Sequence, residues 1–154
     1  MKVKVAQDRV ELGTLAAVQA ADLLRQSLQR HELCNLLVAT GSSQFEVLDS
    51  LVQQPGIAWD RVCGFHLDEY LGVDRSHPAS FCGYLQKRFV ERVPLKSFTY
   101  LDGALPAEQL LQSANAALEG QRIDLLLCGI GENGHLAFND PPANFAATSP
   151  YLIV

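Results

Sequence analysis

The segment Ile123-Asp124-Leu125-Leu126-Leu127-Cys128 is a short apolar run that leads into Gly129-Ile130-Gly131-Glu132-Asn133-Gly134 and then His135. An apolar run of this length followed by glycines predicts a buried strand, and the glycine-rich segment predicts a polar loop at its carboxyl end. Open α/β sheets bind ligands beside the carboxyl ends of their strands. The imidazole of His135, with Asn133 before it and Asp140 after it, is therefore a candidate acid–base cluster.

The letters of residues 129–134 also satisfy the dinucleotide-binding pattern Gly-x-Gly-x-x-Gly. That pattern requires a helix that begins at its last glycine, because the N-terminus of the helix binds the pyrophosphate. Pro141 and Pro142 follow too soon for a useful helix, since proline interrupts a helix interior. The sequence therefore argues against a dinucleotide site.

The composition is typical of one soluble globular domain. The chain has 154 residues, 48% of them hydrophobic, and no apolar run approaches the roughly 18 residues of a membrane span. The net charge of −5, without any run of lysine or arginine, argues against general nucleic-acid binding. The four cysteines, Cys34, Cys63, Cys82 and Cys128, lack metal-ligand spacing and indicate buried residues of a reducing compartment. We therefore expect a cytoplasmic protein with no metal, membrane contact or nucleic-acid partner.

Strand-like and helix-like segments alternate along the chain. Strands are expected at residues 2–6, 33–39, 61–67, 97–101 and 123–128, and helices at residues 8–29, 44–53, 80–93 and 106–118. Asp8 and Glu11 form a capping pattern for the first helix. Its expected apolar face consists of Leu12, Leu15, Ala16, Leu23 and Leu24. The alternation predicts an α/β fold in one domain, residues 1–154: a Rossmann-like, open, mainly parallel sheet with helices on both faces.

The loop Thr40-Gly41-Ser42-Ser43 joins the expected strand 33–39 to the next helix. Gly41 permits a tight turn, and backbone amides beside a helix N-terminus can bind an anion. The loop lacks the Gly-Lys-Ser/Thr of a nucleotide P-loop. Taken alone, such a junction is more often ordinary turn and cap chemistry than an anion site.

Asp68 and Glu69 follow the expected strand 61–67. Adjacent side chains at a strand end point in different directions, so one carboxylate can face a cleft while the other supports the scaffold. An ordinary acidic turn is the simpler alternative. We expect His66, on the same strand, to be a core residue, whereas the glycines and polar neighbours of His135 favour a chemical role.

Several segments together resemble one enzyme family. They are Thr40-Gly41-Ser42-Ser43, Leu67-Asp68-Glu69-Tyr70-Leu71-Gly72, His77-Pro78, Leu101-Asp102-Gly103 and the block 129–141, which ends in Asn-Gly-His-Leu-Ala-Phe-Asn-Asp-Pro. In this order, and over essentially the whole chain, they resemble the glucosamine-6-phosphate deaminases. The related 6-phosphogluconolactonases share the glycine-rich loops but carry arginine at the position of Tyr70 and diverge after the Gly-His pair. The deaminase branch is the better match.

The resemblance implies a small sugar-phosphate substrate, glucosamine 6-phosphate, which is converted to fructose 6-phosphate and ammonium without a metal or organic cofactor. It implies that Asp68 moves the proton between C2 and C1, and that His135, oriented by Asn133 and Asp140, opens the sugar ring. The substrate-binding residues that it implies are Thr40, Gly41, Ser42 and Ser43 around the 6-phosphate, together with Gly134 and a supporting Glu69. A homo-oligomer is compatible with this assignment.

The chain departs from the family pattern in two ways. Asn133 and Asp140 stand where the typical members have aspartate and glutamate. Family chains also extend well beyond 154 residues, and the arginine and lysine that hold the phosphate come from that later part. We therefore expect a C-terminally incomplete domain that is a poor catalyst by itself. A 6-phosphogluconolactonase-like hydrolase and a non-catalytic sugar-phosphate-binding protein are the alternatives.

Overall fold

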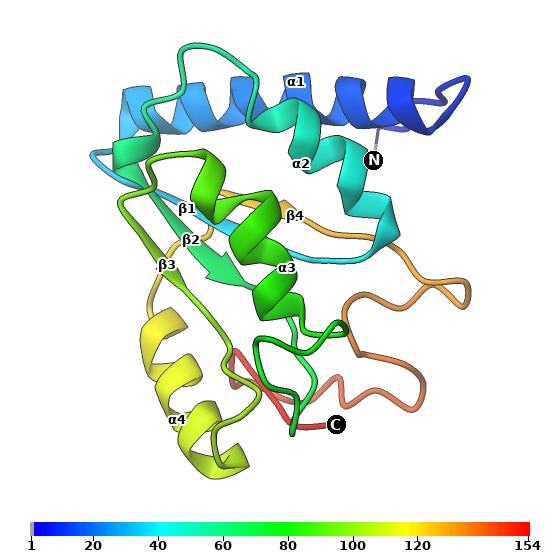
Figure 1. Cartoon of the computed structure of the whole chain (residues 1–154), viewed down its shortest axis with the longest axis vertical. Helices are drawn as coiled ribbons and strands as arrows, with labels where there is room; N and C mark the ends of the chain where they lie inside the picture. The colour runs from blue at the N-terminus through cyan, green and yellow to red at the C-terminus, as the bar shows by residue number, and fades with distance from the viewer. Residues whose placement is uncertain (1) are drawn as a thin grey trace.

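The computed structural model describes residues 2–154, which form one parallel four-stranded sheet (Figure 1). β1 (Cys34–Val38) pairs with β2 (Val62–His66) on one side and with β4 (Leu125–Leu127) on the other, and β3 (Ser97–Thr99) pairs with β2. The strand order is β3-β2-β1-β4. The expected α/β fold with a parallel sheet is confirmed.

Four α-helices accompany the sheet. They are α1 (Arg9–Arg30), α2 (Phe45–Leu51), α3 (Phe81–Arg88) and α4 (Ala107–Leu118), and the short 3-10 helices are η1 (Ser42–Gln44), η2 (Trp59–Arg61) and η3 (Val90–Arg92). No helix within residues 2–154 is both long enough and apolar enough to cross a membrane.

Alternate residues of β1 divide the sheet into two faces. Leu36 and Val38 are fully buried in the main core, which contains Leu24 of α1, Leu48 of α2 and Leu85 of α3. The intervening residue Leu37 faces the other side and borders a cleft beside α4. Helices therefore lie on both faces of the sheet, as expected, and α4 is the helix of residues 2–154 that lies on the second face.

The expected strand at residues 2–6 is wrong, because these residues form no strand. Val3 and Val5 are 72% and 91% exposed. An alternating apolar pattern forms a strand only where a neighbouring strand supplies hydrogen bonds and a core receives its apolar side, and this segment has neither. Each of the other expected elements occurs, although α3 ends at Arg88 and η3 continues it, in place of one helix through residue 93.

The expected buried face of α1 is also largely wrong. Leu12, Leu15 and Leu23 are between 37% and 50% exposed. The buried residues are Gly13, Ala17, Ala20, Ala21, Leu24 and Leu28. A Cβ atom on Gly13 would lie 2.4 Å from the Cβ atom of Glu46, so α1 approaches α2 too closely for large side chains at this position. The small residues of α1 therefore face α2, and three of the leucines face outward.

The Asp124 carboxylate joins α1, β1 and the start of β4. It accepts hydrogen bonds from Ser27 Oγ (2.8 Å), from the Asn35 N–H (2.8 Å) and from Arg122 Nε (2.8 Å), and only 8% of the side chain is exposed. Burial alone would raise the pKa of Asp124, but the hydrogen bonds from Arg122, Asn35 and Ser27 outweigh burial and lower the pKa to about 2.

Asp124→Asn should lower the free energy of unfolding at pH 7 by about 2 kcal/mol, because a carboxylate whose pKa is held near 2 instead of about 4 contributes that amount. The contribution is present above the unfolded-state pKa and disappears as the pH falls from about 4 toward 2. Urea unfolding at pH 7 and at pH 2.5 measures it. Asp22→Asn is the control, since the Asp22–Arg25 pair is exposed and should matter little. An equal loss in both variants would contradict the assignment.

Candidate active site

The parallel register brings the ends of three strands to one edge of the sheet. Val38 of β1 is level with His66 of β2 and with Leu127 of β4. A loop begins two residues after the end of each strand. β1 is followed by residues 40–43, β2 by residues 68–72 and β4 by residues 129–140. These are the loops that the sequence singled out, and they surround a cleft of about 370 Å³. The residues that line this cleft include Thr40, Gly41, Ser42, Ser43, Asp68, Gly129, Gly131, His135 and Phe138.

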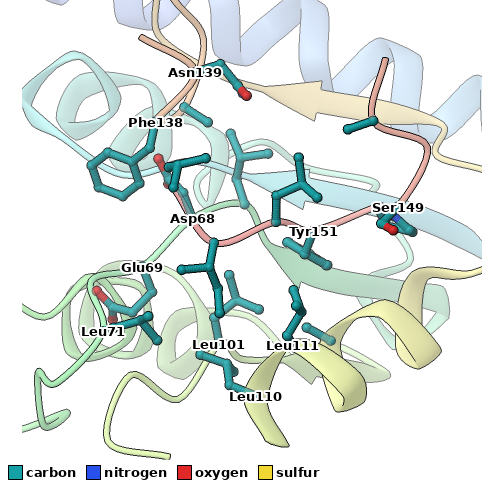
Figure 2. A pocket seen from close by; sticks show the side chains of 18 of the residues that line it. Asp68, Glu69, Leu71, Leu101, Leu110, Leu111, Phe138, Asn139, Ser149 and Tyr151 are labelled. Carbon is teal, nitrogen blue, oxygen red and sulfur yellow. The ribbon is translucent and has the colours of Figure 1, made fainter. Parts of the chain in front are cut away.

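Asp68 stands between two clefts. It lines the 370 Å³ cleft and also a larger cleft of about 720 Å³ under the sheet edge, where Figure 2 shows it near Phe138 and Tyr151. Its Oδ1 atom is buried without a hydrogen-bond partner among the described residues. Burial, and then the charge of Glu69, raise the pKa of Asp68 to about 6. Such a carboxylate can both accept and return a proton near neutral pH.

Glu69 points away from Asp68, toward the N-terminus of α3. Its Oε2 atom accepts hydrogen bonds from the Cys82 N–H (2.7 Å) and from Ser80 Oγ (3.1 Å), while Oε1 accepts from the Phe81 N–H (3.1 Å). A carboxylate at this end of a helix also interacts favourably with the helix dipole. The two adjacent carboxylates thus have different surroundings. The Glu69 carboxylate binds the backbone and the serine hydroxyl at the start of α3.

His135 lies in a compact polar loop. Its Nδ1 atom is 2.5 Å from Asn133 Oδ1 and 3.1 Å from Asp140 Oδ1, and Asn133 Nδ2 donates to Asp140 at 3.3 Å. Both neighbours of Nδ1 are acceptors, so Nδ1 carries the proton and Nε2 of the neutral ring is free to accept one. A Cβ atom on Gly131 would lie 2.2 Å from the ring, so any larger residue there would displace the imidazole from this position. Gly134 turns the chain with a φ of 84°.

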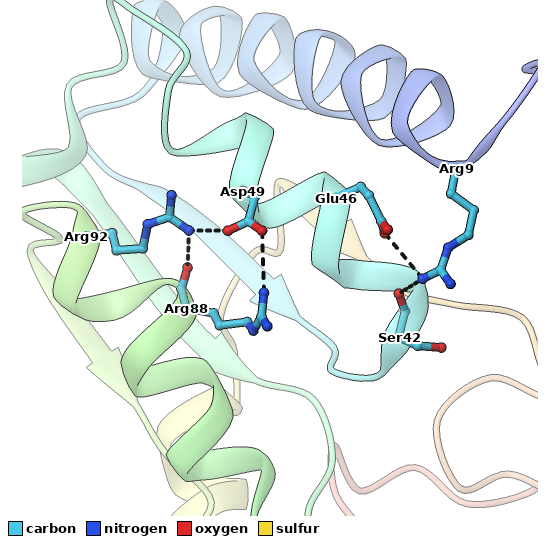
Figure 3. Close-up of polar contacts among 6 residues, drawn as sticks. All are labelled: Arg9, Ser42, Glu46, Asp49, Arg88 and Arg92. Atoms are coloured by element: carbon cyan, nitrogen blue, oxygen red, sulfur yellow. Dashed lines mark hydrogen bonds and ion pairs between the residues drawn. The ribbon is translucent and has the colours of Figure 1, made fainter.

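The Thr40–Ser43 loop also lines the 370 Å³ cleft. Gly41 has a φ of 100°, which favours glycine, and its carbonyl accepts the Gln44 N–H at 3.0 Å. Arg9 of α1 donates to the Ser42 carbonyl at 2.6 Å and lies 3.4 Å from Glu46, as Figure 3 shows. The loop is therefore held from outside the cleft by α1.

No lysine or arginine lines either cleft among the described residues. The donors available to an anion in the 370 Å³ cleft are backbone amides and the hydroxyl groups of Thr40, Ser42 and Ser43. Figure 3 shows that Arg88 and Arg92 pair with Asp49 of α2, and neither arginine lines a cleft. Within residues 2–154, no three histidine, cysteine, aspartate or glutamate side chains gather as a metal site would require.

Tyr151 borders the larger cleft, and the sequence reasoning did not identify it. Its hydroxyl donates to the His66 carbonyl at 2.7 Å, and its backbone exchanges hydrogen bonds with the Asn115 side chain at 2.6 Å and 3.2 Å. Burial, and then the charge of Asp68, raise the pKa of Tyr151 to about 12. The contact joins residues far apart in sequence, so no local pattern could have revealed it. His66 is fully buried, as expected for a core histidine.

Comparisons with known proteins show the family of this chain. Residues 7–148 match the family described as glucosamine-6-phosphate isomerases/6-phosphogluconolactonase. The glucosamine-6-phosphate deaminase of Arthrobacter sp. is 35% identical and covers 96% of this chain, and that of Halalkalibacterium halodurans is 30% identical and covers 86%. The chain spans 58% and 57% of the lengths of these two relatives.

Solved structures give the same result. A monomeric glucosamine-6-phosphate deaminase superposes with a TM-score of 0.83 at 26% identity and covers 96% of this chain, which in turn covers 62% of that structure. The 6-phosphogluconolactonase of Thermotoga maritima has a TM-score of 0.79 at 20% identity, with 89% of this chain and 63% of that structure covered, a likeness of fold alone. The chain therefore belongs to the family of glucosamine-6-phosphate isomerases and 6-phosphogluconolactonases.

Proposed function

We propose that this protein acts as a glucosamine-6-phosphate deaminase, which converts glucosamine 6-phosphate and water to fructose 6-phosphate and ammonium. The observation that carries the proposal is the meeting of Asp68, His135 and the Thr40–Ser43 loop around one cleft. The relatives also favour the deaminase branch, because curated deaminases reach 35% identity while the lactonase structures lie between 15% and 22%. The free state of all four cysteines supports a cytoplasmic location.

His135 carries out the first step of the proposed mechanism. Its free Nε2 atom takes the proton of the C1 hydroxyl and delivers a proton to the ring oxygen, so that the ring opens to the aldehyde. Asp140 and Asn133 hold Nδ1–H during the transfer, and Asp140 stabilises the imidazolium that forms. The asparagine orients the ring without adding charge.

Asp68 carries out the second step. Its carboxylate removes the proton from C2 and returns it to C1, while a proton passes from the amino nitrogen of the substrate to O1. The products of this step are an imine at C2 and a hydroxymethyl group at C1. Water then adds to C2, and ammonium leaves to give the ketose. A base of raised pKa suits this transfer, since the same group must take and then release the proton.

Asp68→Asn should abolish exchange of the C2 proton with solvent while preserving the fold, because an amide cannot take the proton. The variant and the parent chain are incubated with glucosamine 6-phosphate in D₂O, and deuterium at C2 is followed by NMR. For the parent chain, kcat/KM should fall about tenfold per pH unit below about pH 6, where Asp68 becomes protonated. Exchange that survives the substitution, or a profile that is flat down to pH 5, would remove Asp68 from this role.

His135→Gln should lower turnover of the cyclic substrate by about 100-fold or more while changing the melting temperature by only a few degrees, since the residue lies in a loop outside the core. Ammonium release and thermal unfolding measure the two effects. The matched variant His77→Gln, in an exposed loop away from both clefts, should leave both quantities unchanged. Lost stability with normal turnover would instead assign His135 a packing role.

The phosphate cradle should bind weakly in the 154-residue chain. The residues of the Thr40–Ser43 loop offer only uncharged donors to a phosphate. A charge-assisted hydrogen bond would contribute about 1.5–3 kcal/mol of binding free energy, which each uncharged donor does not supply in full. We expect a Kd for glucosamine 6-phosphate on the order of millimolar by calorimetry. Ser43→Ala should weaken it further. A micromolar Kd would show that amides and hydroxyl groups suffice.

One assay separates the proposal from its alternatives. Ammonium and fructose 6-phosphate are measured with glucosamine 6-phosphate as substrate, and hydrolysis of 6-phosphogluconolactone is measured beside them. Lactone turnover without ammonium release would identify a lactonase-like hydrolase. Binding of glucosamine 6-phosphate without either reaction would identify a sugar-phosphate-binding protein.

A further inference from the structure

Phe138 packs against two aromatic rings that belong to the other side of the site. Its ring centroid lies 4.9 Å from that of Tyr70 and 6.1 Å from that of Phe81, and the Phe81 and Phe138 rings are nearly parallel, at 4°. Tyr70 and Phe81 are themselves 5.0 Å apart. Tyr70 belongs to the loop of residues 68–72 that contains Asp68, and Phe81 begins α3, whereas Phe138 belongs to the loop of residues 129–140 that contains His135. The aromatic contact therefore joins the two catalytic loops.

This contact matters because no hydrogen bond or ion pair joins residues 130–147 to the rest of the described chain. Gly131, for example, donates its N–H to the His135 carbonyl at 2.9 Å. The segment connects to the sheet through β4 at one end, and Tyr151 fastens the chain again beyond its other end. Between these points, packing of apolar groups has to fix its place.

Glu69 holds the aromatic pair that receives Phe138. Its Oε1 atom accepts both the Tyr70 N–H at 2.9 Å and the Phe81 N–H at 3.1 Å, so one carboxylate oxygen sets the spacing of the two backbones. The residue that precedes Glu69 is Asp68. A continuous series of bonds and contacts thus runs from the proposed base through Glu69 and the aromatic pair to the ring of Phe138.

We propose that Phe138 is a positioning residue, which holds the His135 loop in register with Asp68 by packing on Tyr70 and Phe81. The chemical part of this inference rests on the proposed function; the anchoring of the loop does not. Displacement of a catalytic group by about 1 Å can cost 100-fold in rate, so loss of this contact should affect turnover although Phe138 itself transfers no proton.

The anchoring is tested by amide hydrogen exchange. Phe138→Ala should accelerate exchange of the Gly131 and Gly134 amides by about tenfold or more, while the amides of α1 and β1 keep their protection. Phe145→Ala is the matched control, because Phe145 belongs to the same segment and is 97% exposed. It should leave the exchange rates unchanged. Similar exchange in the two variants would overturn the proposal.

A second measurement distinguishes positioning from general stability. Phe138→Ala should lower kcat for ammonium release about 10- to 100-fold with little change in KM, and Phe138→Tyr, which keeps the ring, should restore most of it. Tyr70→Ala should add little to Phe138→Ala, since both remove the same contact. Full kcat in Phe138→Ala would overturn the positioning role. A parent chain that releases no ammonium would refute the proposed function, while the exchange experiment would still decide the anchoring.

Discussion

The parallel pairing of β1 with both β2 and β4 is the constraint on which the rest of the site depends. Val38 pairs with His66 of β2 and with Leu127 of β4, so the three strands end level with one another. Each strand then continues into a loop at the same edge of the sheet. A slip of either neighbour by one residue would turn its side chains to the opposite face of the sheet. The register of three short strands therefore determines which groups meet in the cleft, before any loop contact is considered.

Asp68 and Glu69 show how adjacent carboxylates acquire different chemistry from their surroundings. Asp68 loses solvent without gaining a hydrogen-bond partner at Oδ1, so its pKa rises and it becomes suited to proton transfer. Glu69 receives donors from the first turn of α3 and serves the scaffold. The order of the two residues matters, because the strand direction sends the first toward the clefts and the second toward α3.

The sequence predicted the sheet, its parallel character and the loops at its edge, because these depend on local apolar runs and glycines. The sequence did not predict features that depend on contacts between residues far apart in the chain. From their size, Leu12 and Leu15 were expected on the buried face of α1. Because α1 approaches α2 closely at Gly13, the small residues of α1 are the buried ones instead. The pairing of Tyr151 with Asn115 leaves no local signal either. The roles of Asp68 and His135 were proposed from a motif, and the structure adds the burial of Asp68 and the hydrogen-bond partners of His135.

The environment of Asp68 also limits how tightly the site can close. The larger cleft presents mainly apolar groups near this carboxylate, such as Leu101, Leu111 and the ring of Tyr151 (Figure 2). Any group that covers this cleft would remove more water from Asp68 and raise its pKa further, which makes a stronger base but leaves less of it ionised near neutral pH. A cation bound nearby would act in the opposite direction and restore the ionised form. If the loop of residues 40–43 binds a phosphate as proposed, closure of the apolar cleft and positive charge near that phosphate have opposite effects on the pKa of Asp68, and the loop itself supplies only amides and hydroxyl groups.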